Sequence, residues 1–341
     1  MISMRSLSFI STLLCATAFP ATPERSPSCP GNAALRYWMA FALVENPSAD
    51  SELATRLDRV ASGMQPWDDR LATIVDGNQE ALATMHRGTR LPACDWGLET
   101  EMLAETPIGH LSRARALARL NVLYGMRLAQ EGKMADAVDA WLAGARFSRD
   151  IASGGPYLSA LVAGQALNAH LRAIAKAVHD KKLNSATLSK VERSVNEMPE
   201  SGFDWGLAVE AEVGGLSRIV GSAEKADDPA QYLAKYLSSR NGKPDPVTLG
   251  LRLGLTGSQL RDRDRMRALL RQARALYDEL RPELVTAFRG SYDRSIETIK
   301  ALDVRASAGP VSALGWPSAS QLNTRRGEVT RSRSELLALL R

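Results

Sequence analysis

The sequence predicts an all-α protein of antiparallel helical hairpins in a solenoid-like array. Apolar residues recur with helical spacing over long segments, most clearly at Leu111, Ala114, Leu117, Leu120, Tyr124 and Leu128. Short breaks rich in glycine and proline separate such segments, which favours antiparallel neighbours that bury their apolar stripes on one another. No run of alternating apolar and polar residues is long enough to predict a strand.

Helices are expected in succession wherever this periodicity runs between proline or glycine breaks. Three long helices are expected between Leu111 and Asp180, separated by Gly132 and by the break at 154–156. The other expected helices cover about residues 32–45, 49–62, 68–88, 184–197, 204–222, 228–239, 257–300 with a kink or junction at Pro282, and 319–340.

The chain begins with the features of a secretory signal peptide. Arg5 supplies the short positive region, and the apolar core from Leu7 to Ala18 is too short to span a bilayer. Cys15 would allow a lipoprotein, but Leu14 stands where a lipid-attachment signal has a small residue, so no lipid anchor is expected. The predicted parts are a signal peptide at 1–21, a flexible tail at 22–31, a helical repeat-like domain at 32–240, a linker at 241–256 and a C-terminal long-helix region at 257–341. We therefore expect an exported protein, in the periplasm or outside the cell, with no transmembrane span.

Export changes what the cysteines imply. If Cys15 is removed with the signal peptide, Cys29 and Cys94 remain, and an oxidising compartment favours their pairing in a disulfide. The alternative is two unpaired thiols, one of them on the flexible tail. No histidine lies near either cysteine in sequence, and no His-Glu-x-x-His pair exists, so no metal site is expected. No phosphate loop or dinucleotide fingerprint appears, so no cofactor is expected either.

The mildly basic charge of the chain argues against a nucleic-acid partner. The net charge is +5, and the densest basic run, Arg261 to Arg274, is interleaved with Asp262 and Asp264. A nucleic-acid binder concentrates its charge beside aromatic or groove-reading elements. We interpret the run as a solvated helix face, with contact to anionic envelope lipid or polymer as the alternative. Four other arginines lie mostly off the apolar stripe that begins at Leu111, as solvated residues do: Arg113, Arg115, Arg119 and Arg127.

Two blocks of sequence recur in register and indicate an internal duplication. Asp95-Trp96-Gly97-Leu98-x-x-Glu101 recurs as Asp204-Trp205-Gly206-Leu207-x-x-Glu210. Gly109-x-Leu111-Ser112-Arg113 recurs as Gly214-x-Leu216-Ser217-Arg218, and the second copy is about one helical turn shorter between its blocks. Repeated units of this kind stack, and each buries the apolar face of its neighbour.

The repeated residues have structural interpretations. Each aspartate is expected to cap a helix N-terminus, and each tryptophan to lie in the core. Glu101 and Glu210 each follow a core leucine by three residues, so they are expected to point inward and to need a partner. The repeated cations Arg113 and Arg218 would supply it. A functional carboxylate and simple exposure are the alternatives.

A stretch in the middle of the chain resembles a known repeat. Gly132, Ala137, Trp141 and Gly144 are spaced as in the second half of a tetratricopeptide repeat, which this stretch is similar to over about one repeat. The longer run from Pro92 to Val162, together with a first helix at 32–46, looks like a family of uncharacterised exported bacterial α-helical proteins. That resemblance covers residues 30–215, and it implies fold and export but no activity.

One further motif resembles that of an enzyme. Glu200-Ser201-Gly202-Phe203 is similar to the Glu-Ser-x-Phe signature of lytic transglycosylases, which implies peptidoglycan cleavage with Glu200 as general acid. The family's Gln is missing after Gly215-Leu216, and Pro199 replaces its apolar helix end. The first copy of the repeat has no Glu-Ser, so the duplication explains the segment as a linker without chemistry.

The combined observations favour a non-enzymatic envelope scaffold that binds another protein or a peptide in a groove between helix pairs. The lytic transglycosylase-like enzyme is one alternative, and a structural subunit of an envelope complex is another. Gln165 and Asn168 interrupt the apolar stripe of their helix, which predicts a buried polar contact or a place in such a groove. The sequence predicts neither the partner nor the oligomeric state.

Overall fold

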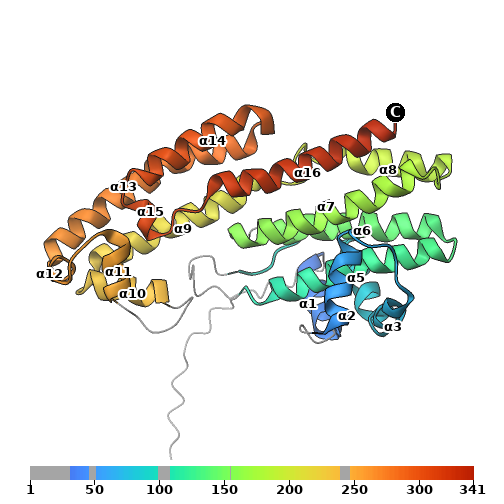
Figure 1. The fold of residues 1–341 in the computed structure, drawn as a ribbon, viewed down its shortest axis with the longest axis horizontal. Helices are drawn as coiled ribbons and strands as arrows, with labels where there is room; N and C mark the ends of the chain where they lie inside the picture. The colour runs from blue at the N-terminus through green and yellow to red at the C-terminus, as the bar shows by residue number, and fades with distance from the viewer. Residues whose placement is uncertain (1–30, 46–50, 99–107, 154, 239–245) are drawn as a thin grey trace, which may run out of the picture. The chain divides into compact units, whose positions relative to one another are not determined.

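The computed structural model describes residues 31–45, 51–98, 108–153, 155–238 and 246–341 (Figure 1). These residues form an all-α protein, which confirms that prediction. Apart from the helices, the described chain holds one isolated parallel bridge, between Asn32 and Ala93, and no strand. None of the helices in the described ranges is both long and apolar enough to cross a membrane.

The first half of the described chain is a set of helices arranged around three long ones. These are α5 (His110–Gln130), α6 (Met134–Ala152) and α7 (Tyr157–His179), each packed against the next. A tight turn joins α5 to α6, and Gly132 permits it because its φ of +78° lies in the left-handed region. The shorter helices are α1 (Ala33–Leu43), α2 (Glu52–Ala61), α3 (Ala72–Gly77) after the short 3₁₀ helix η1 (Asp69–Leu71), α4 (Gln79–Gly88) and α8 (Ser185–Asn196).

The second half adds helices that pack on one another and back on α7. They are α9 (Trp205–Lys225), α10 (Pro229–Ser238), α11 (Pro246–Leu253), α12 (Gly257–Arg261), α13 (Arg263–Arg289), α14 (Tyr292–Ser307), α15 (Val311–Leu314) and α16 (Ala319–Leu339). The most extensive helix pairing in the described chain is that of α9 with α13. The last helix, α16, lies along α7 and contacts α14 (Figure 1).

Two ion pairs show how α9 and α13 are oriented relative to one another. Asp204 at the start of α9 lies 3.2 Å from Arg289 Nε at the end of α13, and Glu224 at the end of α9 lies 3.7 Å from Arg271 Nε. The two helices are therefore antiparallel. Because α9 precedes the predicted linker at 241–256 and α13 comes after it, the sequence-based boundary does not coincide with a gap in packing. Residues 31–341 form one compact unit, and α11 lies within the predicted linker.

Two predicted helices are divided in the structure. The segment at 68–88 breaks at Asn78, whose side-chain amide donates to the carbonyl oxygens of Glu45 and Ile74 at 2.8 and 2.9 Å. The segment at 257–300 becomes α12, α13 and α14, because Asp262 caps a new helix and Gly290 ends it. Pro282 lies inside α13, so it is not a junction between helices.

Candidate functional site

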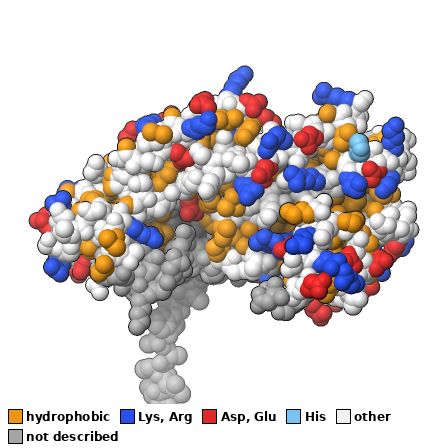
Figure 2. All heavy atoms as spheres, in the orientation of Figure 1, with side chains coloured by type: hydrophobic (Ala, Val, Ile, Leu, Met, Phe, Trp, Pro, Cys, Tyr) orange, Lys and Arg blue, Asp and Glu red, His pale blue; other side chains and the backbone are white. Residues whose placement is uncertain are grey.

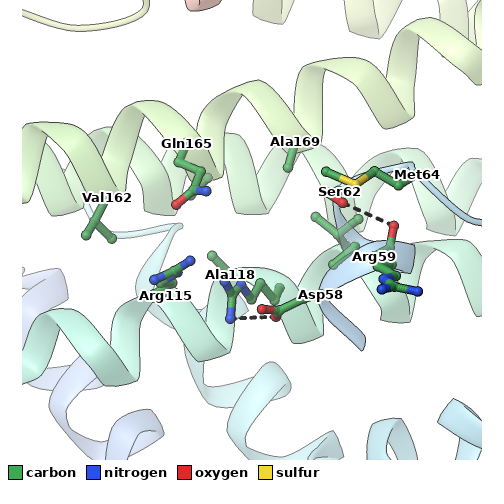
Figure 3. A pocket seen from close by; sticks show the side chains of 13 residues that line it. Asp58, Arg59, Ser62, Met64, Arg115, Ala118, Val162, Gln165 and Ala169 are labelled. Atoms are coloured by element: carbon green, nitrogen blue, oxygen red, sulfur yellow. Dashed lines mark hydrogen bonds and ion pairs between the residues drawn. The ribbon is translucent and has the colours of Figure 1, made fainter. Parts of the chain in front are cut away.

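A pocket of about 230 Å³ opens between α2, α5 and α7. Figure 3 shows Val162, Gln165 and Ala169 of α7 on one side of it, across from Arg115 and Ala118 of α5. We call it the α2/α5/α7 groove. Its lining residues are Asp58, Arg59, Ala61, Ser62, Met64, Arg115, Ala118, Arg119, Val122, Val162, Gln165, Ala166 and Ala169.

Small side chains create the hollow. Alanines line it from three directions, at Ala61 at the end of α2, Ala118 on α5 and Ala166 on α7. A methyl group at each position leaves space that a longer apolar side chain would fill, since interiors otherwise pack to crystal-like density. The groove therefore has an apolar floor, formed where the helix backbones come close together.

Of the four arginines that the sequence places on the polar face of α5, three have a partner elsewhere in the described chain. Arg113 Nη1 donates to the carbonyl oxygen of Val44 at 3.1 Å. Arg119 Nη1 lies 2.6 Å from Asp58 Oδ1, and Arg127 pairs with Asp76 of α3. Arg115 is exposed and makes no hydrogen bond or ion pair with the residues that the structure describes. It is therefore the α5 arginine whose donors remain available in the groove.

The groove carries an excess of positive charge. Three arginines, Arg59, Arg115 and Arg119, line the groove together with a single acidic residue, Asp58. Burial, and next to it the charge of Arg115, lower the pKa of Arg119 below its usual value. Figure 2 shows basic, acidic and hydrophobic side chains mixed over the face on which α5 and α7 lie. Such a site favours an anionic group that has an apolar portion.

The two polar residues that interrupt the stripe of α7 have separate roles. Gln165 is exposed and lines the groove. Asn168 instead makes a partly buried polar contact, because its Oδ1 accepts a 2.6 Å hydrogen bond from Ser332 Oγ of α16. The sequence offered both interpretations, and each residue takes one of them.

The two copies of the repeated motif share their local contacts. Oδ1 of Asp95 accepts from the amide of Gly97 at 2.9 Å, and Oδ1 of Asp204 accepts from the amide of Gly206 at 2.8 Å. Trp96 and Trp205 are both buried. Their indole N–H groups donate to main-chain carbonyls, those of Asp150 and Ser201, at 2.7 and 2.8 Å. These residues are structural in both copies.

The copies differ in the backbone after the aspartate. Asp204 is the N-cap of α9, as predicted. Asp95 closes the same short turn, but Gly97 has a φ of +62° and residues 95–98 are not helical. Asp95 is instead tied to the start of α1, since Asn32 Nδ2 donates to its carbonyl oxygen at 2.8 Å. The capping prediction is therefore confirmed for the second copy only.

Of the two repeated glutamates, the structure describes Glu210 and not Glu101. Glu210 is half-exposed, and it forms an ion pair with Arg281 Nε of α13 at 3.7 Å. The expected pair with Arg218 stays a prediction. Arg113, the cation predicted to pair with Glu101, donates a hydrogen bond to the carbonyl oxygen of Val44. Glu101 lies outside the described residues. The contact with Arg281 was not predictable because it comes from a helix more than 60 residues away in the sequence.

Cys94 is half-buried, and its thiol lies 3.8 Å from the carbonyl oxygen of Asp150. Burial and the nearby Asp150 carboxylate raise the pKa of Cys94 to about 12. Cys29, Cys15 and the predicted signal peptide lie outside the described residues, so the disulfide stays a prediction.

Glu200 is exposed on the loop between α8 and α9, and it does not line the α2/α5/α7 groove. Its neighbour Ser201 is buried and accepts a 3.0 Å hydrogen bond from Arg326 Nε of α16. Arg326 is itself buried and also donates to the carbonyls of Ala287 and Gly290 at the C-terminal end of α13. Arg326 thus connects the loop around Glu200 to α16 and to the C-terminal end of α13. Nothing in the polar sequence of α16 distinguishes Arg326 from its exposed neighbour Arg325.

The sequence also did not predict a hydrogen-bond network of polar side chains in the core. Asn121 Oδ1 accepts a 2.7 Å hydrogen bond from His86 Nε2, and Asn121 Nδ2 lies 3.1 Å from His170 Nε2. His179 is exposed, so the two histidines of α7 do face different ways. No cluster of His, Cys, Asp or Glu that would hold a metal ion occurs among the described residues.

Comparison with known proteins leaves the groove as the main guide to function. No family model, no curated protein and no solved structure matches the chain.

Proposed function

We propose that this protein is an exported, non-enzymatic helical scaffold that binds another protein or a peptide in the α2/α5/α7 groove. The observation that carries the proposal is the groove itself, with its apolar floor and its arginine Arg115 that lacks a partner among the described residues.

The size of the groove favours part of a larger ligand. Pockets for small molecules typically measure about 300–1,000 Å³. The groove measures about 230 Å³. One or two side chains of a partner chain fit such a volume, and the rest of the partner would lie over the surrounding helix surfaces.

The arrangement of the central helices supports a repeat-like scaffold. α5, α6 and α7 succeed one another with short connections, as in tetratricopeptide-like and other solenoid arrays. Gly125 lies against the indole of Trp141, and Gly144 against His170, so glycines allow close helix approach in the segment that resembles the repeat. The predicted signal peptide at 1–21 supports export.

Site-specific photo-crosslinking tests the proposal. The photoreactive residue p-benzoylphenylalanine replaces Met64, an exposed residue that lines the groove, in the full chain expressed in its own cells. In a control it replaces Lys176 of α7. We expect a discrete protein adduct from position 64 and none from position 176, because Lys176 is exposed but does not line the groove.

The adduct partner is then purified and its affinity measured. Gln165→Trp fills the groove from an exposed position, so it should weaken binding about tenfold or more without changing the melting temperature. Lys176→Trp should leave the affinity within about twofold. Equal affinity of both variants, or no adduct specific to position 64, would show that the groove is not the binding site.

A further inference from the structure

We propose that the α2/α5/α7 groove recognises an acidic side chain of its partner, with a carboxylate held by Arg115 and Arg119. This inference depends on the proposed function and adds the chemistry of the ligand. It makes the groove an anchor for a glutamate- or aspartate-containing peptide segment.

Arg115 and Arg119 place two guanidinium groups at the groove. Arg115 and Arg119 are four residues apart on α5, and side chains with this spacing are neighbours on one helix face. Two like charges at this spacing repel each other unless an anion lies between them. Asp58 neutralises Arg119 alone, through one contact of 2.6 Å. Arg115 has no such partner in the described chain, and a planar guanidinium is well matched to a carboxylate.

An apolar surface lies beside these charges. Val162, Ala166 and Ala169 of α7 line the opposite wall, and Met64 stands at the groove with 78 % of its surface exposed. These groups contact a hydrocarbon stem better than they contact water. A carboxylate on a short aliphatic stem matches both parts of the groove. A free phosphate has charge but no apolar part, and 230 Å³ leaves little room for a lipid chain.

Gln165 lies on α7 above the groove (Figure 3). Its amide offers two donors and one acceptor, which is the complement of a peptide group. The residue is exposed and makes no hydrogen bond with the described residues, so these positions are available to a bound main chain. A peptide would therefore be held at its carboxylate by α5 and at its backbone by α7.

Asp58 acts as an internal competitor in this arrangement. Its carboxylate occupies Arg119 in the structure, so an incoming acid gains the full charge of Arg115 and only a share of Arg119. Removing the Asp58 charge should therefore strengthen acid binding. A site in which Asp58 and Arg119 only hold α2 onto α5 would not respond in this way.

Fluorescence anisotropy with two labelled peptides tests the inference. The probes are an amidated peptide with the repeat Ala-Leu-Glu, taken three times, and its counterpart with Gln in place of Glu. The mature chain should bind the Glu peptide about tenfold more tightly than the Gln peptide, as expected for a charge-assisted contact. Arg115→Gln should remove this preference, and Asp58→Asn should raise the Glu-peptide affinity about threefold. Arg193→Gln, an exposed change on α8 outside the groove, should alter nothing.

Several outcomes would overturn the inference. Equal affinities for the two peptides would do so, as would a Glu preference that survives in Arg115→Gln. Arg115-dependent binding of phosphatidylglycerol vesicles, with no response to the Glu peptide, would identify a lipid headgroup instead. Displacement of the Glu peptide by inorganic phosphate at lower concentration than by glutarate would identify a phosphate site.

The failure of this inference is distinguishable from failure of the proposed function. If Gln165→Trp abolishes binding of the crosslinked partner and Arg115→Gln does not, the groove binds a partner by other chemistry. If Gln165→Trp has no effect on the partner, the groove is not the interface, and both proposals fail.

Discussion

Asn121 Nδ2 donates a 3.1 Å hydrogen bond to Nε2 of His170, and both side chains are completely buried. His170 Nδ1 lies 2.7 Å from the carbonyl oxygen of Ala166, which can only accept a hydrogen bond. The imidazole is therefore neutral, with its proton on Nδ1. Ala166 lines the α2/α5/α7 groove, so this buried pair fixes one wall of the candidate site.

This geometry predicts acid sensitivity. Burial lowers the pKa of His170 from 6.5 to about 4. The stability that depends on neutral His170 is fully present above pH 6.5. It is lost between pH 6.5 and 4, because in that range the histidine binds a proton in the unfolded chain but not in the folded chain. At pH 4.5 the loss should be on the order of 2 kcal/mol, and His86, whose pKa burial also lowers, should add to it.

Urea unfolding at pH 7.5 and pH 4.5 measures this loss. His170→Gln should be less stable at pH 7.5 but should show a smaller loss on acidification than the unmodified chain. His179→Gln, at an exposed position on the same helix, should keep the full loss. An identical acid loss in His170→Gln would rule out His170 as the source.

Gly144→Ala should destabilise the core strongly. An added Cβ would contact His170 Nε2 and Asn121 Nδ2, and neither is the end of a flexible side chain. We expect a loss of about 2–3 kcal/mol in the free energy of unfolding, as for other overpacked sites. Gly257→Ala is the matched control, because a Cβ there meets nothing within 4 Å. Comparable melting of the two variants would contradict the close approach of α6 to this pair.

Arg326→Met should cost about 3 kcal/mol, since it removes a donor from several buried or partly buried acceptors. They are the carbonyls of Ala287 and Gly290, Ser295 Oγ, and Ser201 Oγ, which keeps a hydrogen bond from Thr330 Oγ1. Arg325→Met removes only an exposed pair with Glu328 and should cost no more than about 0.5 kcal/mol. Chemical denaturation of both variants measures the difference, and similar midpoints would show that Arg326 does not join α13 to α16.

Asp204→Ala should lower the stability by roughly 1 kcal/mol because it removes a helix N-cap, and Asp95→Ala should lower it by less, because the exposed turn at Asp95 caps no helix. Each loses the carboxylate that accepts from a main-chain amide two residues on, and Asp204 also loses its contact with Arg289. Thermal melting measures both. Unchanged melting in the two variants would show that the repeated aspartates do not stabilise their turns.

The all-α fold could be predicted because helical periodicity is a local property of the sequence. The repeated Asp-Trp motif was also visible, but the different backbone of its two copies was not. Both copies have glycine two residues after the aspartate, but only Gly97 has a positive φ, in a segment tied to Asn32. Local sequence carries no record of that tie.

The groove could be predicted only in part. Gln165 was identified because a polar residue interrupts an apolar stripe. Arg115 was grouped with Arg113, Arg119 and Arg127 as solvated, and the structure separates it from them by the partners that α2 and α3 supply to Arg119 and Arg127. Those partners are more than 50 residues away in the sequence, so a pattern within α5 cannot identify them.

Methyl NMR spectroscopy of the mature chain during titration with the Glu peptide tests the groove most directly. Occupation of the groove should shift the methyl signals of Val122, Val162 and Met64, and Gln165→Trp should abolish those shifts. Shifts confined to another exposed apolar surface, such as Val247 and Leu251 of α11, would contradict the assignment of the binding site to α2, α5 and α7.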